Sequence, residues 1–214
     1  MRTRLKVCCI ASREEARLAI AHGADALGFV GPMPSGPGPQ PLALTASIVP
    51  HVPPPVASVF LTCQTEAECI LAEALASGAN TVQIVNHIDP AEYAALRRLP
   101  QLRFFQVVHV EDRGAITLAR EYATVADAIL LDSGRVSLPV PELGGTGRVH
   151  DWSISADIVR QLEKPVFLAG GLNPGNVARA IAEVRPFGLD LCSGVRTDGK
   201  LDAAKLAAFV AAMG

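Results

Sequence analysis

Apolar runs rich in Val, Ile, Leu and Phe alternate with amphipathic, alanine-rich segments along the whole chain. The runs predict eight β-strands, and the segments between them predict helices. Ser12, placed ahead of Glu14 and Glu15, is an N-cap signal for the first helix. The expected strands are 5–9, 26–30, 56–62, 81–86, 103–109, 128–132, 165–169 and 188–193.

The strands read as nearly continuous apolar runs, which is typical of a parallel sheet covered by helices on its faces. Eight strand–helix units in 214 residues predict an α/β protein with a single-domain (β/α)8 TIM barrel over residues 1–214. The alternative is an open doubly wound sheet. No G-x-G-x-x-G fingerprint follows the first strand, and this disfavours the open sheet.

Composition narrows the possible partners of this protein. Half of the residues are apolar, so a large aliphatic core can form, and the net charge of −2 comes without a basic block that would favour nucleic acid or a membrane surface. No apolar run reaches membrane-span length. Five dispersed cysteines predict reduced thiols in a cytoplasm. We expect a monomer or homodimer that takes a small-molecule substrate and needs no cofactor or metal.

Barrel enzymes carry their active sites at the carboxyl ends of the strands. Strand alternation predicts that Lys6 and Cys8 share one side of the first strand and that Cys9 faces the other. A thiol, a carboxylate and two imidazoles form an acid–base set. The residues expected at the strand ends are Cys8, Cys9, Asn86, His87, His109, Asp132, Gly170, Gly171, Ser193 and Gly194.

The residue types alone leave several roles open. A free cysteine such as Cys8 often behaves as a small buried hydrophobe, and Asp132 has a second interpretation as a turn former. His87 and His109 are candidates for proton transfer but make a poor metal-binding set. Strand eight closes a barrel against strand one, so Lys6 and Asp190 are predicted to pair inside it, because a lone buried charge is costly.

Two glycine loops follow the seventh and eighth strands, in "FLAGGLNPGNVARAI" (167–181) and "DLCSGVRTDG" (190–199). Loops at these positions of a barrel form phosphate sites from backbone N–H groups, and glycine permits close approach of the anion. The alternative is ordinary loop closure. The predicted phosphate-binding residues are Gly170, Gly171, Ser193 and Gly194.

Six stretches of the chain together resemble the phosphoribosylanthranilate isomerase family: "KVCCI" (6–10), "GADALGFV" (23–30), "ILLDS" (129–133), "GGTGRVHDW" (144–152), "LAGGLNPGNVARAI" (168–181) and "RPFGLDLCSGV" (185–195). The resemblance implies an isomerase of tryptophan biosynthesis. Such an enzyme rearranges an N-phosphoribosyl anthranilate to its 1-deoxyribulose form. It implies that Cys8 is the base and Asp132 the general acid. The expected substrate-binding residues are Gly145, Thr146, Gly147, Arg148 and His109.

The chain departs from this family at several positions. The family has a Lys/Arg-rich segment after strand two, whose arginine holds the anthranilate carboxylate, a task that suits a guanidinium. Here residues 31–41 read "GPMPSGPGPQP" and contain no cation. Cys9 stands where glycine is usual, "QIVNH" replaces a QLHG-like run, and His150 replaces an aromatic residue. The arginines that offer a substitute clamp are Arg135, Arg148 and Arg196.

Three hypotheses follow from these matches and departures. The first is an isomerase of the family, and the second is a divergent barrel that isomerises a different sugar phosphate. The third is a non-catalytic protein that binds a phosphorylated metabolite. The uncharged segment favours the second hypothesis, whereas Cys8 and Asp132 together count against the third.

Overall fold

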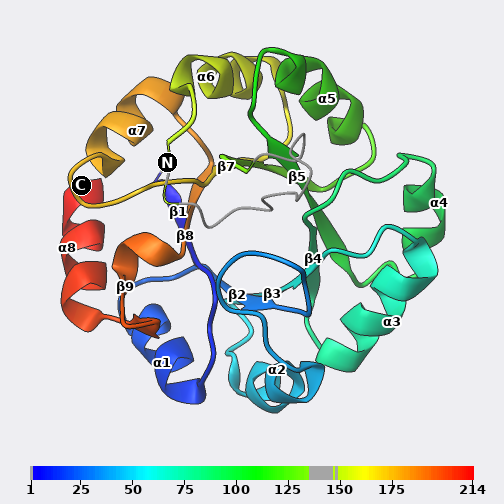
Figure 1. Ribbon diagram of the computed structural model, residues 1–214, viewed down its shortest axis with the longest axis horizontal. Helices are drawn as coiled ribbons and strands as arrows, with labels where there is room; N and C mark the ends of the chain where they lie inside the picture. Colours follow the sequence, from blue (N-terminus) through cyan, green and yellow to red (C-terminus); the bar gives the residue numbers. More distant parts are fainter. Residues whose placement is uncertain (1, 135–146, 148) are drawn as a thin grey trace.

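The computed structural model describes residues 2–134, 147 and 149–214. Eight parallel strands close into a barrel in the order β1-β2-β3-β4-β5-β6-β7-β8, and an outer ring of helices surrounds them (Figure 1). The predicted (β/α)8 barrel is therefore confirmed. Among the described residues, no helix is both long enough and apolar enough to cross a membrane.

The barrel strands are β1 (Arg4–Val7), β2 (Ala26–Val30), β3 (Ala57–Thr62), β4 (Thr81–Ile84), β5 (Arg103–His109), β6 (Ala128–Asp132), β7 (Val166–Leu168) and β8 (Gly188–Leu191). The helices are α1 (Arg13–Ala21), α2 (Leu42–Ile48), α3 (Ala67–Ser77), α4 (Glu92–Leu96), α5 (Gly114–Ala123), α6 (Trp152–Gln161), α7 (Val177–Val184) and α8 (Ala203–Met213). Short 3-10 turns η1 (Val49–His51) and η2 (Ser193–Val195) and a small hairpin of β9 (Arg196–Thr197) and β10 (Lys200–Leu201) complete the described elements.

Four strands end earlier than their apolar patterns predict. The runs 5–9, 81–86, 165–169 and 188–193 were each extended one or two residues too far. Cys8, Val85 and Ala169 still donate a backbone hydrogen bond to the neighbouring strand, so the apolar pattern continues just past the regular pairing. Ser12, by contrast, caps α1 as predicted, since its hydroxyl accepts a hydrogen bond from the Glu15 N–H at 3.2 Å.

The barrel closes between its first and last strands. β1 pairs with β8 in a register that sets Lys6 opposite Asp190, and Lys6 Nζ lies 2.8 Å from Asp190 Oδ2. The Lys6 side chain is 0% exposed and that of Asp190 is 8% exposed. The predicted ion pair is confirmed. Burial alone would lower the pKa of Lys6, but the adjoining Asp190 carboxylate reverses this and raises it above its ordinary value.

Replacement of Lys6 by methionine tests this ion pair. Lys6→Met leaves the Asp190 carboxylate buried without a counter-charge, so we expect a loss of about 3–5 kcal/mol in the free energy of unfolding. Urea titration followed by circular dichroism measures the change. The double variant Lys6→Met/Asp190→Asn removes both charges and should recover much of this loss. A single variant as stable as the unmodified protein would contradict the prediction.

Candidate active site

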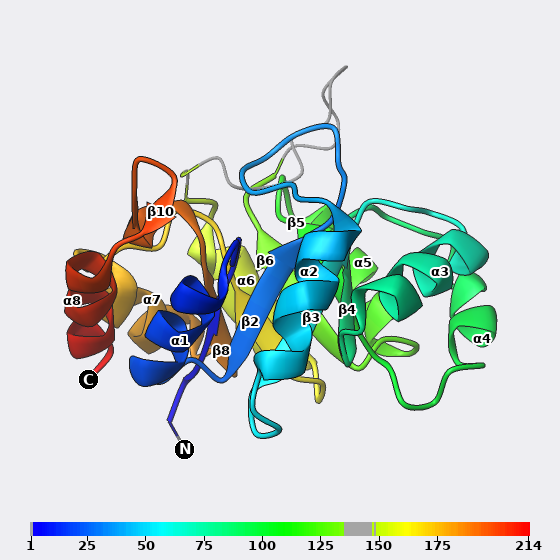
Figure 2. The same cartoon turned by 90° about the horizontal axis from the view of Figure 1, so that it is seen from below.

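A pocket opens at the carboxyl ends of the strands, below the segment that joins β2 to α2. Figure 2 shows this segment rising above the rim of the barrel, at the end opposite the chain's N-terminus. The residues that line the pocket come from several strand ends and loops around the barrel. They include Cys8, Cys9, Met33, Ser35, Gln83, Asp132, Gly147, Gly170, Gly171, Asp190, Cys192, Ser193 and Gly194. Its described lining contains no lysine or arginine.

Cys8 lies directly beyond β1, where its backbone N–H donates to the Leu191 carbonyl at 2.7 Å. A β-carbon at Gly28 would come within 2.7 Å of Cys8 Sγ and 3.1 Å of Lys6 Nζ, so only glycine leaves room for both groups. A hydrogen bond with the Cys9 thiol lowers the pKa of Cys8, burial opposes the shift, and the Lys6 ammonium lowers the pKa further. The Cys8 thiol is therefore poised to act as a base.

Cys9 does not face away from Cys8, so the prediction from strand alternation was wrong. The strand has already ended at Val7, and Cys9 has a left-handed backbone with φ of 64° that turns its side chain toward the pocket. Its Sγ donates to the Pro37 carbonyl at 3.4 Å. Hydrogen bonds with the Cys192 and Cys8 thiols, together with burial, raise the pKa of Cys9. The pKa values of these two adjacent cysteines thus shift in opposite directions.

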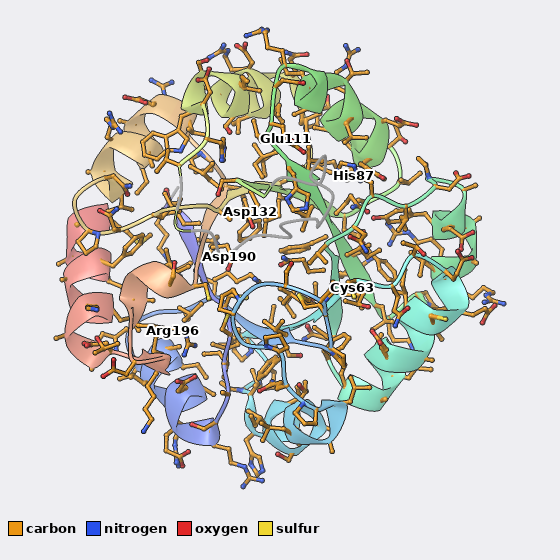
Figure 3. All side chains as sticks on the ribbon, viewed as in Figure 1. Cys63, His87, Glu111, Asp132, Asp190 and Arg196 are labelled. Atoms are coloured by element: carbon orange, nitrogen blue, oxygen red, sulfur yellow. The ribbon has the colours of Figure 1, made fainter. Side chains whose placement is uncertain are left out.

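Asp132 is the last residue of β6 and also lines the pocket. Burial raises the pKa of its carboxyl group, although the Ser133 N–H and the Lys6 ammonium act in the other direction. A carboxyl group with a raised pKa is suited to donate a proton near neutral pH. Figure 3 shows Asp132 and Asp190 inside the ring of strands.

The glycine loops lie next to each other on the same side of the pocket. Gly170 and Gly171 have φ of 84° and 64°, and no group in the described part of the chain accepts a hydrogen bond from either backbone N–H. The Asn176 amide donates to the Gly171 carbonyl at 2.9 Å and holds the first loop in shape. A β-carbon at Gly194 would lie 2.2 Å from the Leu172 carbonyl oxygen, so this glycine allows the two loops to meet. Such loops suit an anion.

His109 was expected to bind substrate, but the structure does not bring it to the pocket. Its ring is 4% exposed, its Nε2 lies 3.0 Å from the Val85 carbonyl, and burial lowers its pKa. The His87 ring lies at a centroid distance of 5.9 Å from it and is tilted by 40°. Figure 3 labels His87 and Glu111 on the side of the barrel near α5. The described residues include no cluster of three or more side chains able to hold a metal ion.

Of the predicted glycine-rich substrate segment, Gly147 lines the pocket. Gly145, Thr146 and Arg148 lie outside the described residues, as does Arg135.

Arg196 does not reach into the pocket as a carboxylate clamp. Its guanidinium donates to the Cys8 and Cys9 carbonyls and to Gly199, and pairs with Glu15 at 3.0 Å. The Glu15 carboxylate also raises the pKa of Arg196 against the opposing effect of burial. Figure 3 places Arg196 toward α1, away from the barrel axis. Arg196 fixes the loop that carries both thiols.

At two polar side chains of the pocket, the structure gives a sign of function that the sequence analysis missed. Gln83 Oε1 and Asp190 Oδ1 are buried without a hydrogen-bond partner in the described part of the structure. Gln83 interrupts the apolar run "VQIV", which was the available sign of a function. Asp190 was expected only to neutralise Lys6. Unpartnered buried acceptors are rare in native proteins and suggest ligand donors.

The protein is a single-domain barrel whose pocket contains a thiol and a carboxyl group suited to proton transfer. Beside them lie two glycine loops suited to bind an anion. The sequence model of the N-(5'phosphoribosyl)anthranilate (PRA) isomerase family matches residues 5–212. The chain therefore belongs to the PRA isomerase family.

Individual relatives agree with this membership. N-(5'-phosphoribosyl)anthranilate isomerase 2 of Methanosarcina mazei is 36% identical over 210 residues, which are 97% of this chain and 92% of that protein. The crystal structure of phosphoribosyl anthranilate isomerase from Thermotoga maritima matches with a TM-score of 0.83 and 31% identity, over 99% of this chain and 98% of that one. A further isomerase structure has a TM-score of 0.80 at 28% identity, with the same coverage, and contains reduced 1-(o-carboxyphenylamino)-1-deoxyribulose 5-phosphate.

Because the pKa of Cys8 is lowered and that of Cys9 is raised, we predict selective alkylation of Cys8. We expect iodoacetamide at neutral pH to modify Cys8 well before Cys9, because the thiolate is the reactive form. Trypsin releases both thiols in the peptide 7–13, and tandem mass spectrometry locates the label.

Cys9→Ala should move the pH midpoint of Cys8 alkylation upward, since it removes the hydrogen bond that lowers the Cys8 pKa. Replacement of the exposed Cys69 by alanine is the matched control and should leave that midpoint unchanged. Equal labelling of Cys8 and Cys9 would refute the assignment.

Proposed function

We propose that this protein isomerises N-(5'-phosphoribosyl)anthranilate to 1-(o-carboxyphenylamino)-1-deoxyribulose 5-phosphate, with Cys8 as base and Asp132 as acid. The observation that carries the proposal is that Cys8 and Asp132 line one pocket and that their pKa values shift in opposite directions. The pKa of Cys8 is lowered and the pKa of Asp132 is raised, which brings a base and an acid toward neutral pH. Membership of the PRA isomerase family supplies the substrate class.

The chemistry requires two proton transfers on opposite sides of the sugar. Asp132 gives its proton to the ring oxygen as the bond from C1' to that oxygen breaks, which leaves an iminium between C1' and the anthranilate nitrogen. The Cys8 thiolate then takes the proton from C2'. The electrons of that C–H bond form the double bond between C1' and C2' and neutralise the nitrogen. The product is an enolamine, which becomes the ketone by tautomerisation.

The glycine loops are proposed to hold the phosphate. The N–H groups of Gly170 and Gly171, which have no acceptor among the described residues, support this role. Ser193 and Gly194 on the adjoining loop of the same pocket support it as well. Anchoring of the phosphate here would extend the sugar across the barrel mouth toward Cys8 and Asp132. A relative with 28% identity forms a complex with a reduced sugar phosphate of this kind.

The uncharged segment 31–41 marks the end of the pocket where the anthranilate would lie. Ser35 and Pro37 line the pocket there, and no lysine or arginine belongs to the segment. This observation favours the second candidate function, isomerisation of a sugar phosphate without an aromatic carboxylate. Complementation of a strain that lacks the isomerase, together with a fluorescence assay of the purified protein on PRA, decides between the two functions.

Substitution of the acid and the base should reduce turnover more than stability. We expect Cys8→Ser and Asp132→Asn each to lower kcat by about 10²–10⁴-fold, the usual contribution of a general acid or base. The melting temperature should change little, because both groups are preorganised for substrate and neither closes the barrel. Cys9→Ser is the matched control at the adjacent thiol. A damaging Cys9→Ser combined with a silent Cys8→Ser would reverse the assignment.

An added cation near the aromatic end should improve binding of PRA. Ser35→Arg places a guanidinium beside the expected position of the carboxylate, and a charge-assisted pair contributes about 10–10²-fold in affinity. We expect KM for PRA to fall, as measured by steady-state kinetics. Ser35→Gln is the matched control without charge. If both variants behave alike, the carboxylate is bound elsewhere in the pocket.

A further inference from the structure

The two carboxylate oxygens of Asp190 differ in their partners within the described part of the chain. Its Oδ2 accepts from Lys6 Nζ at 2.8 Å, whereas its Oδ1 is buried with no partner among the described residues. The carboxylate is 8% exposed and lines the pocket. A desolvated carboxylate oxygen without a donor is costly, so this geometry suits a site at which a bound ligand supplies the donor. Lys6 holds the side chain in place and keeps the other oxygen occupied.

Asp190 lies on the strand next to the proposed base. β8 is the direct neighbour of β1, and the Cys8 N–H bonds to the Leu191 carbonyl, one residue beyond Asp190. Asp132 follows on β6, with only β7 between it and β8. Around the mouth of the barrel, Asp190 therefore stands between the base and the acid, and Figure 3 shows both carboxylates within the barrel. Among the described residues that line the pocket, Gln83 has the other buried acceptor without a partner, and it belongs to β4.

The reacting carbon carries a hydroxyl group as well as the proton that Cys8 removes. When that proton points at Cys8, directly beyond β1, the hydroxyl on the same tetrahedral carbon must point toward a neighbouring part of the pocket wall. Asp190 Oδ1 on β8 is the unpartnered acceptor on the strand next to the base. A hydroxyl donates readily to a carboxylate.

We propose that Asp190 is a substrate-binding residue that accepts a hydrogen bond from the 2'-hydroxyl through Oδ1 and so turns the C2' proton toward Cys8. This inference rests on the proposed function, since it names the part of that substrate which Asp190 contacts. Lys6 acts through Asp190 as a positioning residue. The ion pair that closes the barrel is thereby also a part of the binding site.

Two ligands that differ by one hydroxyl test the contact. Reductive amination of ribose 5-phosphate with anthranilate gives an adduct with the 2'-hydroxyl, and 2-deoxyribose 5-phosphate gives the same adduct without it. Titration calorimetry measures both Kd values for each protein. We expect the unmodified protein to bind the hydroxyl adduct about 10–10²-fold more tightly, because the deoxy adduct leaves the buried Oδ1 of Asp190 without a hydrogen-bond donor.

The discrimination should disappear when Asp190 is removed. In Lys6→Met/Asp190→Ala, which leaves no lone charge in the barrel, we expect a ratio of the two Kd values near one. Asp190→Asn, which keeps the shape of the side chain, should give an intermediate ratio and a kcat lowered by about 10–10²-fold. Since each ratio is taken within one variant, a general loss of stability cancels.

Asp25→Asn is the matched control, because Asp25 is also a paired carboxylate next to β1 but lies at the opposite end of the barrel, against Arg2 and Arg4. It should keep the ratio of the unmodified protein. A ratio near one in the unmodified protein, or an undiminished ratio in Lys6→Met/Asp190→Ala, would overturn the role of Asp190 while leaving the proposed function intact. Failure of both adducts to bind the unmodified protein would overturn the proposed function and this inference with it.

Discussion

The ion pair between Lys6 and Asp190 is the constraint on which both the fold and the site depend. Its partners are 184 residues apart in the chain, and they meet only when the last strand docks on the first. In a parallel pair of apolar strands, register is weakly specified by hydrophobic pattern alone. A slip by one residue would set Lys6 against Leu189 or Leu191 and leave two charges unpaired in the interior, which makes the observed register the stable one.

The same pair explains how one buried pocket holds an acid and a base together. Burial raises the pKa of any carboxyl or thiol, as it does for Asp132 and Cys9. Cys8 escapes this trend because it has the Cys9 thiol and the Lys6 ammonium as neighbours. Desolvation thus raises the pKa of the acid Asp132, whereas a hydrogen bond and a nearby positive charge lower the pKa of the base Cys8.

The sequence allowed the barrel and much of the site to be predicted, because strand spacing and strand-end chemistry are local signals. The alternating units predicted the topology. Lys6 and Asp190 each stand two residues before a cysteine on the first and last strands, which must meet to close the barrel, and this predicted their pairing. The orientation of Cys9 could not be predicted in this way, since a left-handed residue breaks the alternation on which the inference relied. The contacts of Arg196 depend on the path of a distant hairpin, and the unpartnered oxygen of Gln83 is visible only once the pocket exists.

The absence of lysine and arginine from the described lining of the pocket has a consequence for the way a ligand is captured. Cationic clefts draw anions from a distance, and dissolved salt weakens that attraction over a Debye length of about 10 Å at 0.1 M. Backbone N–H groups on the proposed anion loops act instead at contact range, where little screening occurs. The described lining thus recognises an anion through short-range contacts with backbone N–H groups, and none of its side chains adds the long-range attraction of a cation.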